Sequence, residues 1–170
     1  MSRFSVGIDL GTTHSAVSYL DLGAEHGRGR EQTMLGIPQV TAPGTVEERS
    51  LLPSFLYLPN ADEFPAAGLN LPWDASGQAP LVGEFARAHG AKVPARLVAS
   101  AKSWLCHPGV DRQGPILPWQ APADVARVSP LQASAHTLAH LRAAWDHRFP
   151  DTPLAEQEVV LTVPASFDEV

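Results

Sequence analysis

The chain opens with a strict alternation of apolar and polar side chains. The apolar residues of segment 4–8 alternate with small or polar ones that end at Asp9, and a period of two predicts a strand with one apolar face. Strand-like sequence resumes at residues 16–20, and Gly11 in between permits backbone angles that other residues resist. The pattern predicts a β-hairpin from Phe4 to Tyr19, with Asp9 on the face opposite the apolar residues.

The middle of the chain is irregular and rich in proline. Residues 38–80 contain one short apolar segment that predicts a strand, from Phe55 to Leu58. Helical composition then predicts one helix from Glu84 to His89 and a second that starts near Pro94 and runs to Leu105. A second proline-rich connection follows at residues 108–124.

The last third carries the clearest helix. Ser129 is an N-cap residue and Pro130 takes the first helical position, so we expect a helix that continues to about Phe149. Its apolar residues at helical spacing predict one broad packing face, formed by Leu131, Leu138, Leu141, Trp145 and Phe149.

A strongly apolar strand and a helix start follow this helix. Residues 159–163 form an almost unbroken apolar run, which predicts a strand covered on both faces in a largely parallel sheet. Ser166 and Glu169 then have the spacing of a capping box, in which each side chain satisfies the other's backbone donor. Because the sequence stops one residue later, we expect it to be part of a longer protein.

Composition narrows the classes of partner. The chain has 170 residues, of which 44% are hydrophobic and 18% charged, with a formal net charge of -6. We therefore expect no nucleic acid and no anionic membrane among its partners. One cysteine, Cys106, makes no internal disulfide, and no apolar run approaches the ~18 residues of a membrane span. Together these features predict a cytoplasmic protein.

The hairpin turn is the best candidate for chemistry. Gly11, Thr12 and Thr13 can direct backbone N–H groups and two hydroxyls at a phosphate. A carboxylate ~4 Å from a phosphate oxygen costs roughly 4 kcal/mol per charge pair, so Asp9 requires a cation between them, and hydrated Mg²⁺ fits. The same residues also suit an ordinary turn. Neither a P-loop nor a Rossmann fingerprint is present.

Residues 6–15, with the sequence VGIDLGTTHS, resemble the first phosphate motif of the actin-like ATPases, and most closely that of the heat shock protein 70 (DnaK-like) chaperones. Further segments resemble this family in the same order: LPSF at 52–55, VG at 82–83 with AK at 101–102, and VLTVPASF at 160–167. Residues 23–49, 59–80 and 107–128 match poorly, which indicates a divergent relative.

This resemblance implies an α/β fold of the ribonuclease H-like (actin-like ATPase) kind, incomplete here, with a mixed sheet and flanking helices. Residues 1–37 would begin the ribonuclease H-like subdomain and carry the phosphate hairpin. Residues 38–125 would form a smaller inserted subdomain, and residues 126–170 would return to the first.

The resemblance also implies roles for single residues. Gly11, Thr12 and Thr13 would bind the phosphates of ATP or ADP, Asp9 would hold hydrated Mg²⁺, and Lys102 would reach the transferring phosphate and its attacking water. On spacing alone, Lys102 is an ordinary lysine on a helix surface. Client proteins and co-chaperones would bind through regions outside this sequence.

Several readings of function stay open. The family's second phosphate loop, adenosine pocket and second lobe are absent from the sequence, so we expect this chain alone to be inactive and to bind nucleotide weakly or not at all. Pro164 matches a proline that relays nucleotide state in the family, but it also serves simply to end a strand. A sugar kinase or related phosphotransferase shares the Gly-Thr-Thr hairpin, although segments 53–55 and 163–165 argue against it. A non-hydrolysing nucleotide sensor or structural relative is the third possibility.

Three histidines raise the question of a metal site. His136, His140 and His147 project from one side of the predicted helix, opposite Leu138 and Trp145. We expect them to face solvent and, without an H-E-x-x-H arrangement, to bind no metal.

Overall fold

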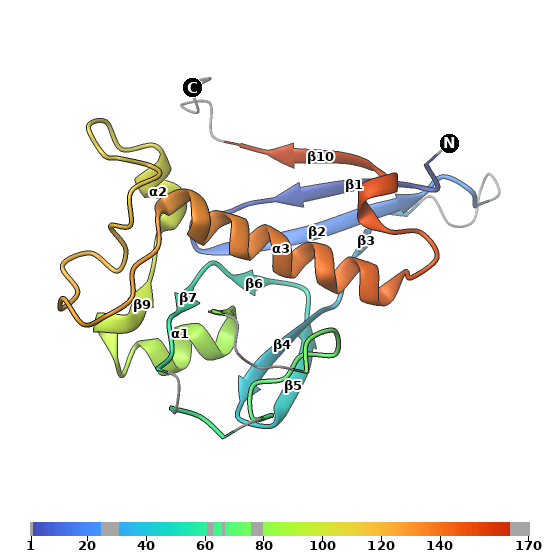
Figure 1. Ribbon diagram of the computed structural model, residues 1–170. Helices are drawn as coiled ribbons and strands as arrows, with labels where there is room; N and C mark the ends of the chain where they lie inside the picture. The colour runs from blue at the N-terminus through green and yellow to red at the C-terminus, as the bar shows by residue number, and fades with distance from the viewer. Residues whose placement is uncertain (1, 25–30, 61–62, 66, 76–79, 164–170) are drawn as a thin grey trace.

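The architecture is α/β, with one mixed sheet, a long helix against it and a group of smaller elements beside them (Figure 1). The structure is a computed structural model that describes residues 2–24, 31–60, 63–65, 67–75 and 80–163. The predicted capping box at Ser166 and Glu169, and Pro164, lie outside the described residues.

The described residues form short strands and three α-helices. The strands are β1 (Phe4–Asp9), β2 (His14–Asp21), β3 (Thr33–Met34), β4 (Ile37–Ala42), β5 (Thr45–Arg49), β6 (Leu52–Pro53), β7 (Leu56–Tyr57), β8 (Leu81–Val82), β9 (Leu97–Val98) and β10 (Glu158–Thr162). The helices are α1 (Glu84–Gly90), α2 (Ala101–Leu105) and α3 (Pro130–Arg148), with 3-10 turns at Pro94–Arg96 and Leu154–Glu156.

The main sheet joins the two ends of the chain. Its order is β10-β1-β2-β3, and β6 pairs with β2 away from this path. β1 and β2 are antiparallel, which confirms the predicted hairpin. β10 runs parallel to β1, with Val6 opposite Val159 and Asp9 opposite Thr162. The carboxyl ends of β1 and β10 therefore meet at the edge of the sheet where the hairpin turns.

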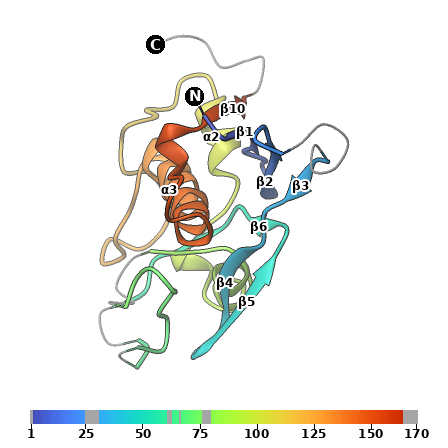
Figure 2. The ribbon, with the colours of Figure 1, turned by 90° about the vertical axis from the view of Figure 1, so that its right-hand side faces the viewer.

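Helix α3 covers one face of this sheet, as Figure 2 shows from the side. The predicted start is confirmed, because the Ser129 hydroxyl accepts from the backbone of Gln132 at 3.0 Å and the Gln132 side chain accepts from the backbone of Ser129 at 2.9 Å. Trp145 is fully buried against the ring of Phe4, at 5.3 Å between centroids. Burial of large aromatic rings of this kind stabilises the core strongly.

Most of the predicted apolar face of α3 is confirmed, because Leu141 and Trp145 are buried and Leu138 and Phe149 pack against the core. Leu131 was expected to pack as well, but it is 51% exposed. Small side chains such as Ala133 and Ala144 are also buried. The reason is that α3 also contacts β4, β7 and β8, so its buried side extends beyond the predicted face to its small residues.

The expectation that the three histidines of α3 all face solvent is wrong. His147 is exposed and His136 is partly buried, but His140 is buried, with its Nε2 atom 2.9 Å from the carbonyl oxygen of Pro38. The ring of Trp73 packs edge-on against it at 5.2 Å. Within the described residues, no group of three potential metal ligands forms.

Burial of His140 predicts a loss of stability in acid. Burial lowers the pKa of His140 to about 4, whereas an unfolded histidine titrates near 6.5. The unfolded chain thus binds more protons between these values, so the contribution of His140 is complete above pH 6.5 and is lost as pH falls toward 4. We expect this to lower the free energy of unfolding by about 3 kcal/mol. Urea unfolding across this range should show a shallower pH dependence in His140→Gln but not in the exposed control His147→Gln.

The smaller elements form a second cluster around Tyr57 and Phe85. The predicted strand appears as the short β7, flanked by β8 and β9 in a three-stranded sheet, and the first predicted helix is confirmed as α1. The predicted helix from Pro94 to Leu105 is wrong. Leu97 and Val98 pair with β7 and Val98 is buried, so this tertiary pairing divides the segment into a 3-10 turn, a strand and the short α2.

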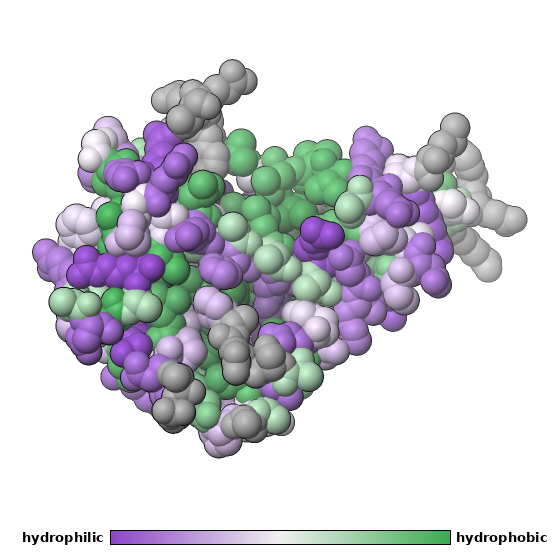
Figure 3. Space-filling view, in the orientation of Figure 1, coloured by the Kyte–Doolittle hydropathy of each residue, from purple (hydrophilic) through white to green (hydrophobic). Residues whose placement is uncertain are grey.

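β10 lies parallel to β1 as expected, but the expectation that both its faces are covered is wrong. All five of its residues are exposed, and the side chain of Val160 is 59% exposed. Figure 3 shows the corresponding apolar surface at the top of the molecule. Among the described residues, β10 pairs only with β1, and the side chains on both faces of β10 stay exposed. Among the residues that the structure describes, none of the helices could span a membrane.

Candidate functional site

The turn between β1 and β2 is held tightly by its glycine. A Cβ atom at Gly11 would lie 2.0 Å from the carbonyl oxygen of His14, which is far inside van der Waals contact. Leu10 is buried beneath the turn, while Thr12 and Thr13 are exposed above it. The sequence therefore needs glycine here to bring the backbone across the turn.

The hydrogen-bond donors of this turn are uncommitted. The hydroxyls of Thr12 and Thr13, and the backbone N–H groups of Gly11 to Thr13, donate to no acceptor in the part of the chain that the structure describes. Such a set of donors at one backbone turn suits an anion with several oxygens. Phosphate binding by Gly11, Thr12 and Thr13 stays a prediction.

Asp9 stands at the base of the turn with its carboxylate exposed. Thr162 of β10 donates a hydrogen bond from its hydroxyl to Asp9 Oδ1 at 2.8 Å. The two residues face each other in the parallel register of β1 and β10. Thr162 was missed from the sequence because this register joins residues 153 positions apart. It orients the Asp9 side chain without neutralising its charge.

The segment after β6 supports the turn from below. Ser54 donates from its hydroxyl to the carbonyl oxygen of Gly11 at 2.8 Å, and its backbone N–H donates to the carbonyl oxygen of Thr13 at 2.9 Å. The hydroxyl of buried Ser15 lies 3.0 Å from that of Ser54. Ser54 therefore holds both ends of the turn between β1 and β2, which the sequence pattern did not reveal.

Removing the Ser54 hydroxyl should loosen the turn. We expect Ser54→Ala to lower the free energy of unfolding by about 1 to 2 kcal/mol, because the carbonyl of Gly11 and the hydroxyl of Ser15 lose a partner in a partly buried place. Thermal or urea unfolding measures this loss. Ser103→Ala, at an exposed position on α2, is the control and should change stability by less than about 0.5 kcal/mol; equal effects would contradict the supporting role.

Gly83 lets α1 approach β6 closely. Its φ angle is +97°, and a Cβ atom there would lie 2.6 Å from Gln39 Oε1 and 2.7 Å from Leu52 Cδ1. Gln39 is fully buried, and its Oε1 accepts from the backbone N–H of Glu84 at 3.1 Å. Its Nε2 donates to the carbonyl oxygen of Leu51 at 2.8 Å. Gln39 thus connects the start of α1 to Leu51, close in sequence to Ser54, which supports the turn.

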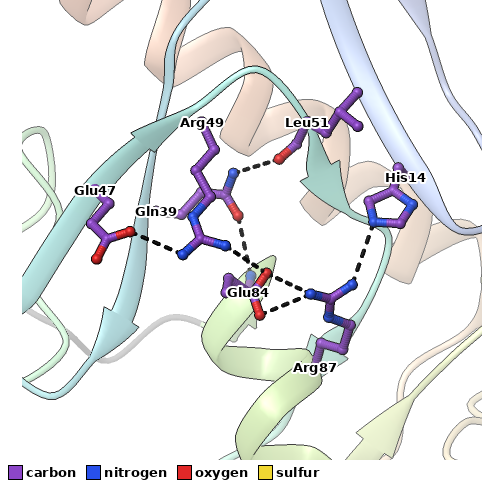
Figure 4. A network of polar contacts seen from close by, with 7 residues as sticks. All are labelled: His14, Gln39, Glu47, Arg49, Leu51, Glu84 and Arg87. Carbon is purple, nitrogen blue, oxygen red and sulfur yellow. Dashed lines mark hydrogen bonds and ion pairs between the residues drawn. The ribbon is translucent and has the colours of Figure 1, made fainter.

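Because α1 is held at this position, the cationic side chain of Arg87 reaches the hairpin (Figure 4). Arg87 Nη1 lies 3.4 Å from Nε2 of His14, the residue that follows Thr13. Arg87 Nη2 donates to both carboxylate oxygens of Glu84, at 2.9 and 2.8 Å. A surface hollow of about 260 Å³ opens between these groups, lined by His14, Arg49, Ser50, Leu51, Pro53, Glu84 and Arg87.

Lys102 occupies a different place. It lies on α2 with a partly exposed side chain, and it makes no hydrogen bond or ion pair with another described residue. Figure 1 shows α2 at the same end of the molecule as the hairpin turn. The contact of Lys102 with a phosphate stays a prediction, whereas the side chain of Arg87 lies beside His14, directly after the turn.

The Asp9 carboxylate beside the turn fits a magnesium ion that keeps most of its water. Asp9 offers one exposed carboxylate, and no group of three candidate ligands exists in the described ranges. Mg²⁺ is commonly held by one or two carboxylates together with substrate phosphates and several waters. One oriented aspartate, next to groups that can donate to a phosphate, is therefore compatible with a Mg²⁺ ion that a bound phosphate also holds.

Comparison with known proteins gives one informative similarity. The chain is similar to a bacterial chaperone. Chaperone protein HscA of Enterobacter sp. (strain 638) is 31% identical over 98% of this chain, and the chain spans 23% of the length of that relative. No protein-family model matches the chain. The similarity agrees with the resemblance to the heat shock protein 70 chaperones, and it includes the hairpin and its supporting segments because it covers almost the whole chain.

Proposed function

We propose that this chain is the beginning of the ATPase domain of a heat shock protein 70-like chaperone, in which the β1–β2 hairpin binds the phosphates of ATP or ADP. The observation that supports this most is the turn itself. Its donors are uncommitted, and next to them stands an exposed carboxylate that Thr162 orients. The similarity to a chaperone along 98% of the chain supports the same assignment.

Each residue of the turn has a separate role in this proposal. Gly11 permits the narrow backbone path, and Thr12 and Thr13 donate hydrogen bonds to phosphate oxygens. Asp9 holds a hydrated Mg²⁺, which when bound neutralises phosphate charge and polarises the reacting group. Ser54 keeps the turn in shape from below. Together they position phosphates, which is the protein's main contribution in phosphoryl-transfer sites.

The wider assignment rests on the resemblance to the family. We assign residues 1–37 and 126–170 to the ribonuclease H-like part of an actin-like ATPase and residues 38–125 to an inserted subdomain, whose β6 pairs with β2 of the main sheet. In the whole protein, this part acts with a second phosphate loop, and client proteins and co-chaperones bind elsewhere. The protein acts in the cytoplasm.

Calorimetric titration of the whole protein with Mg-ATP and Mg-ADP tests the proposal. We expect a single nucleotide site that requires Mg²⁺, followed by slow release of phosphate from ATP without a sugar acceptor. This chain alone should bind at least tenfold more weakly, because one hairpin leaves the nucleotide half solvated. Absence of nucleotide binding to the whole protein would contradict the proposal, and phosphate transfer to a sugar would favour a kinase.

A further inference from the structure

His14 begins β2 directly after the turn between β1 and β2, and its ring faces α1 (Figure 4). Its Nε2 atom lies 3.4 Å from Arg87 Nη1. A guanidinium has hydrogen-bond donors and no acceptor, so this hydrogen bond requires an unprotonated Nε2 atom on the imidazole. The contact therefore selects the neutral ring of His14, with its proton on Nδ1.

The donor in this contact is anchored by a mostly buried carboxylate. Arg87 Nη2 donates to both oxygens of Glu84, at 2.9 and 2.8 Å, and the side chain of Glu84 is only 16% exposed. One of these oxygens also accepts from Arg49, at 3.2 Å. A guanidinium bound in this way has a fixed plane, which leaves Nη1 directed at the hairpin. His14 is thus joined to α1 through a donor that Glu84 holds in place.

Protonation of His14 would remove this contact. An imidazolium carries a proton on each nitrogen and has no acceptor, so His14 and Arg87 would face each other as two cations. The charged side chains that line the hollow with His14 are those of Arg49, Glu84 and Arg87. Glu84 already accepts from both arginines, and the described residues place no second carboxylate in the wall of this hollow.

The contact lies where it can control the shape of the turn. Ser54 holds Gly11 and Thr13 from the side of β6, whereas His14, the next residue along the chain, ties the turn to α1. The turn has to present several donors to one anion, and such a site binds well only when neighbouring contacts keep its geometry fixed. Loss of the tie to α1 therefore weakens the site without removing any of its donors.

We propose that His14 is a positioning residue for the nucleotide site: its neutral ring fastens the turn to α1, and protonation of the ring releases the turn and weakens nucleotide binding. This inference rests on the proposed function, because it concerns nucleotide bound at the turn. Histidine is the side chain that ordinarily changes its charge between about pH 5 and pH 8, so mild acid weakens the site.

Calorimetric titration of the whole protein with Mg-ADP at about pH 7.5 and about pH 5.5 tests this role. The conservative variant His14→Gln has an amide oxygen that can accept from Arg87 at both pH values. We expect its affinity at the higher pH to stay within about threefold of that of the unmodified protein. At the lower pH it should bind about fivefold to tenfold more tightly than the unmodified protein. Comparing the two proteins at one pH cancels the titration of the nucleotide itself.

Two further variants separate the acceptor from its surroundings. His14→Leu removes the acceptor without adding a charge, so it should bind Mg-ADP about fivefold to tenfold more weakly than His14→Gln at both pH values. His147→Gln changes an exposed histidine on α3 and should keep the pH dependence of the unmodified protein.

The outcomes that would overturn the role of His14 are distinct. The same pH dependence in His14→Gln and in the unmodified protein would show that protonation of His14 has no effect on the site. Weaker binding by His14→Gln than by the unmodified protein at the lower pH would show that an imidazolium at position 14 contacts the phosphates itself. In both cases nucleotide still binds and the proposed function stands. Failure of the unmodified protein to bind Mg-ADP at either pH would overturn the proposed function and this inference together.

Discussion

Asp9→Asn should lower ATP turnover by the whole protein about a hundredfold, which corresponds to ~2.7 kcal/mol of lost transition-state stabilisation. The change removes the negative charge that holds the metal. It leaves an oxygen that can still accept the hydrogen bond of Thr162, so the fold should persist. Steady-state release of phosphate measures the effect, and excess Mg²⁺ should partly restore activity.

Two companion variants delimit the role of Asp9. Thr162→Val keeps the β-branched shape and removes the orienting hydroxyl, so we expect a smaller loss of about tenfold. Lys102→Ala tests the role that the resemblance implies for this lysine and should also reduce turnover strongly if that role holds. Turnover that is unchanged in Asp9→Asn would contradict the metal-holding role, whatever the other variants show.

Gly11→Ala should be among the most destabilising single changes in the chain. The added methyl would meet the backbone oxygen of His14 at 2.0 Å, so the turn has to open. We expect a loss of about 2 to 4 kcal/mol in the free energy of unfolding, together with loss of nucleotide binding.

Gly7 offers a matched control in the preceding strand. A Cβ atom at Gly7 would meet the Ser18 side chain at 3.4 Å, which is an ordinary contact. Gly7→Ala should therefore change stability by less than about 1 kcal/mol. Equal stability of the two variants in urea would show that the turn has room for a side chain and would contradict the close backbone approach described here.

The elements that local sequence determines were predicted well. The β1–β2 hairpin follows from an alternation of period two and one glycine, and the start of α3 follows from Ser129 and Pro130. Both signals act over a few residues, so no distant partner is needed to interpret them. The candidate residues Asp9 to Thr13 could be named for the same reason, because they lie within one turn.

The features that depend on distant partners were not predictable. His140 is buried because β4 approaches the polar side of α3, and the segment after Pro94 forms β9 because β7 pairs with it. The contacts of Thr162 with Asp9, and of Arg87 with His14, likewise join residues far apart in the chain. A single sequence does not show how such distant segments pair, so the supporting residues of the site could be identified only from the structure.

The site at the hairpin can be tested directly with a paramagnetic metal. Mn²⁺ replaces Mg²⁺ in the ATP complex and broadens nearby nuclear magnetic resonance signals in the whole protein labelled at threonine methyls. We expect Mn-ATP to broaden the signals of Thr12, Thr13 and Thr162, whereas those of Thr45 and Thr152 stay sharp. Sharp signals from Thr12 and Thr13 at saturating Mn-ATP would place the phosphates elsewhere and contradict the proposed phosphate site.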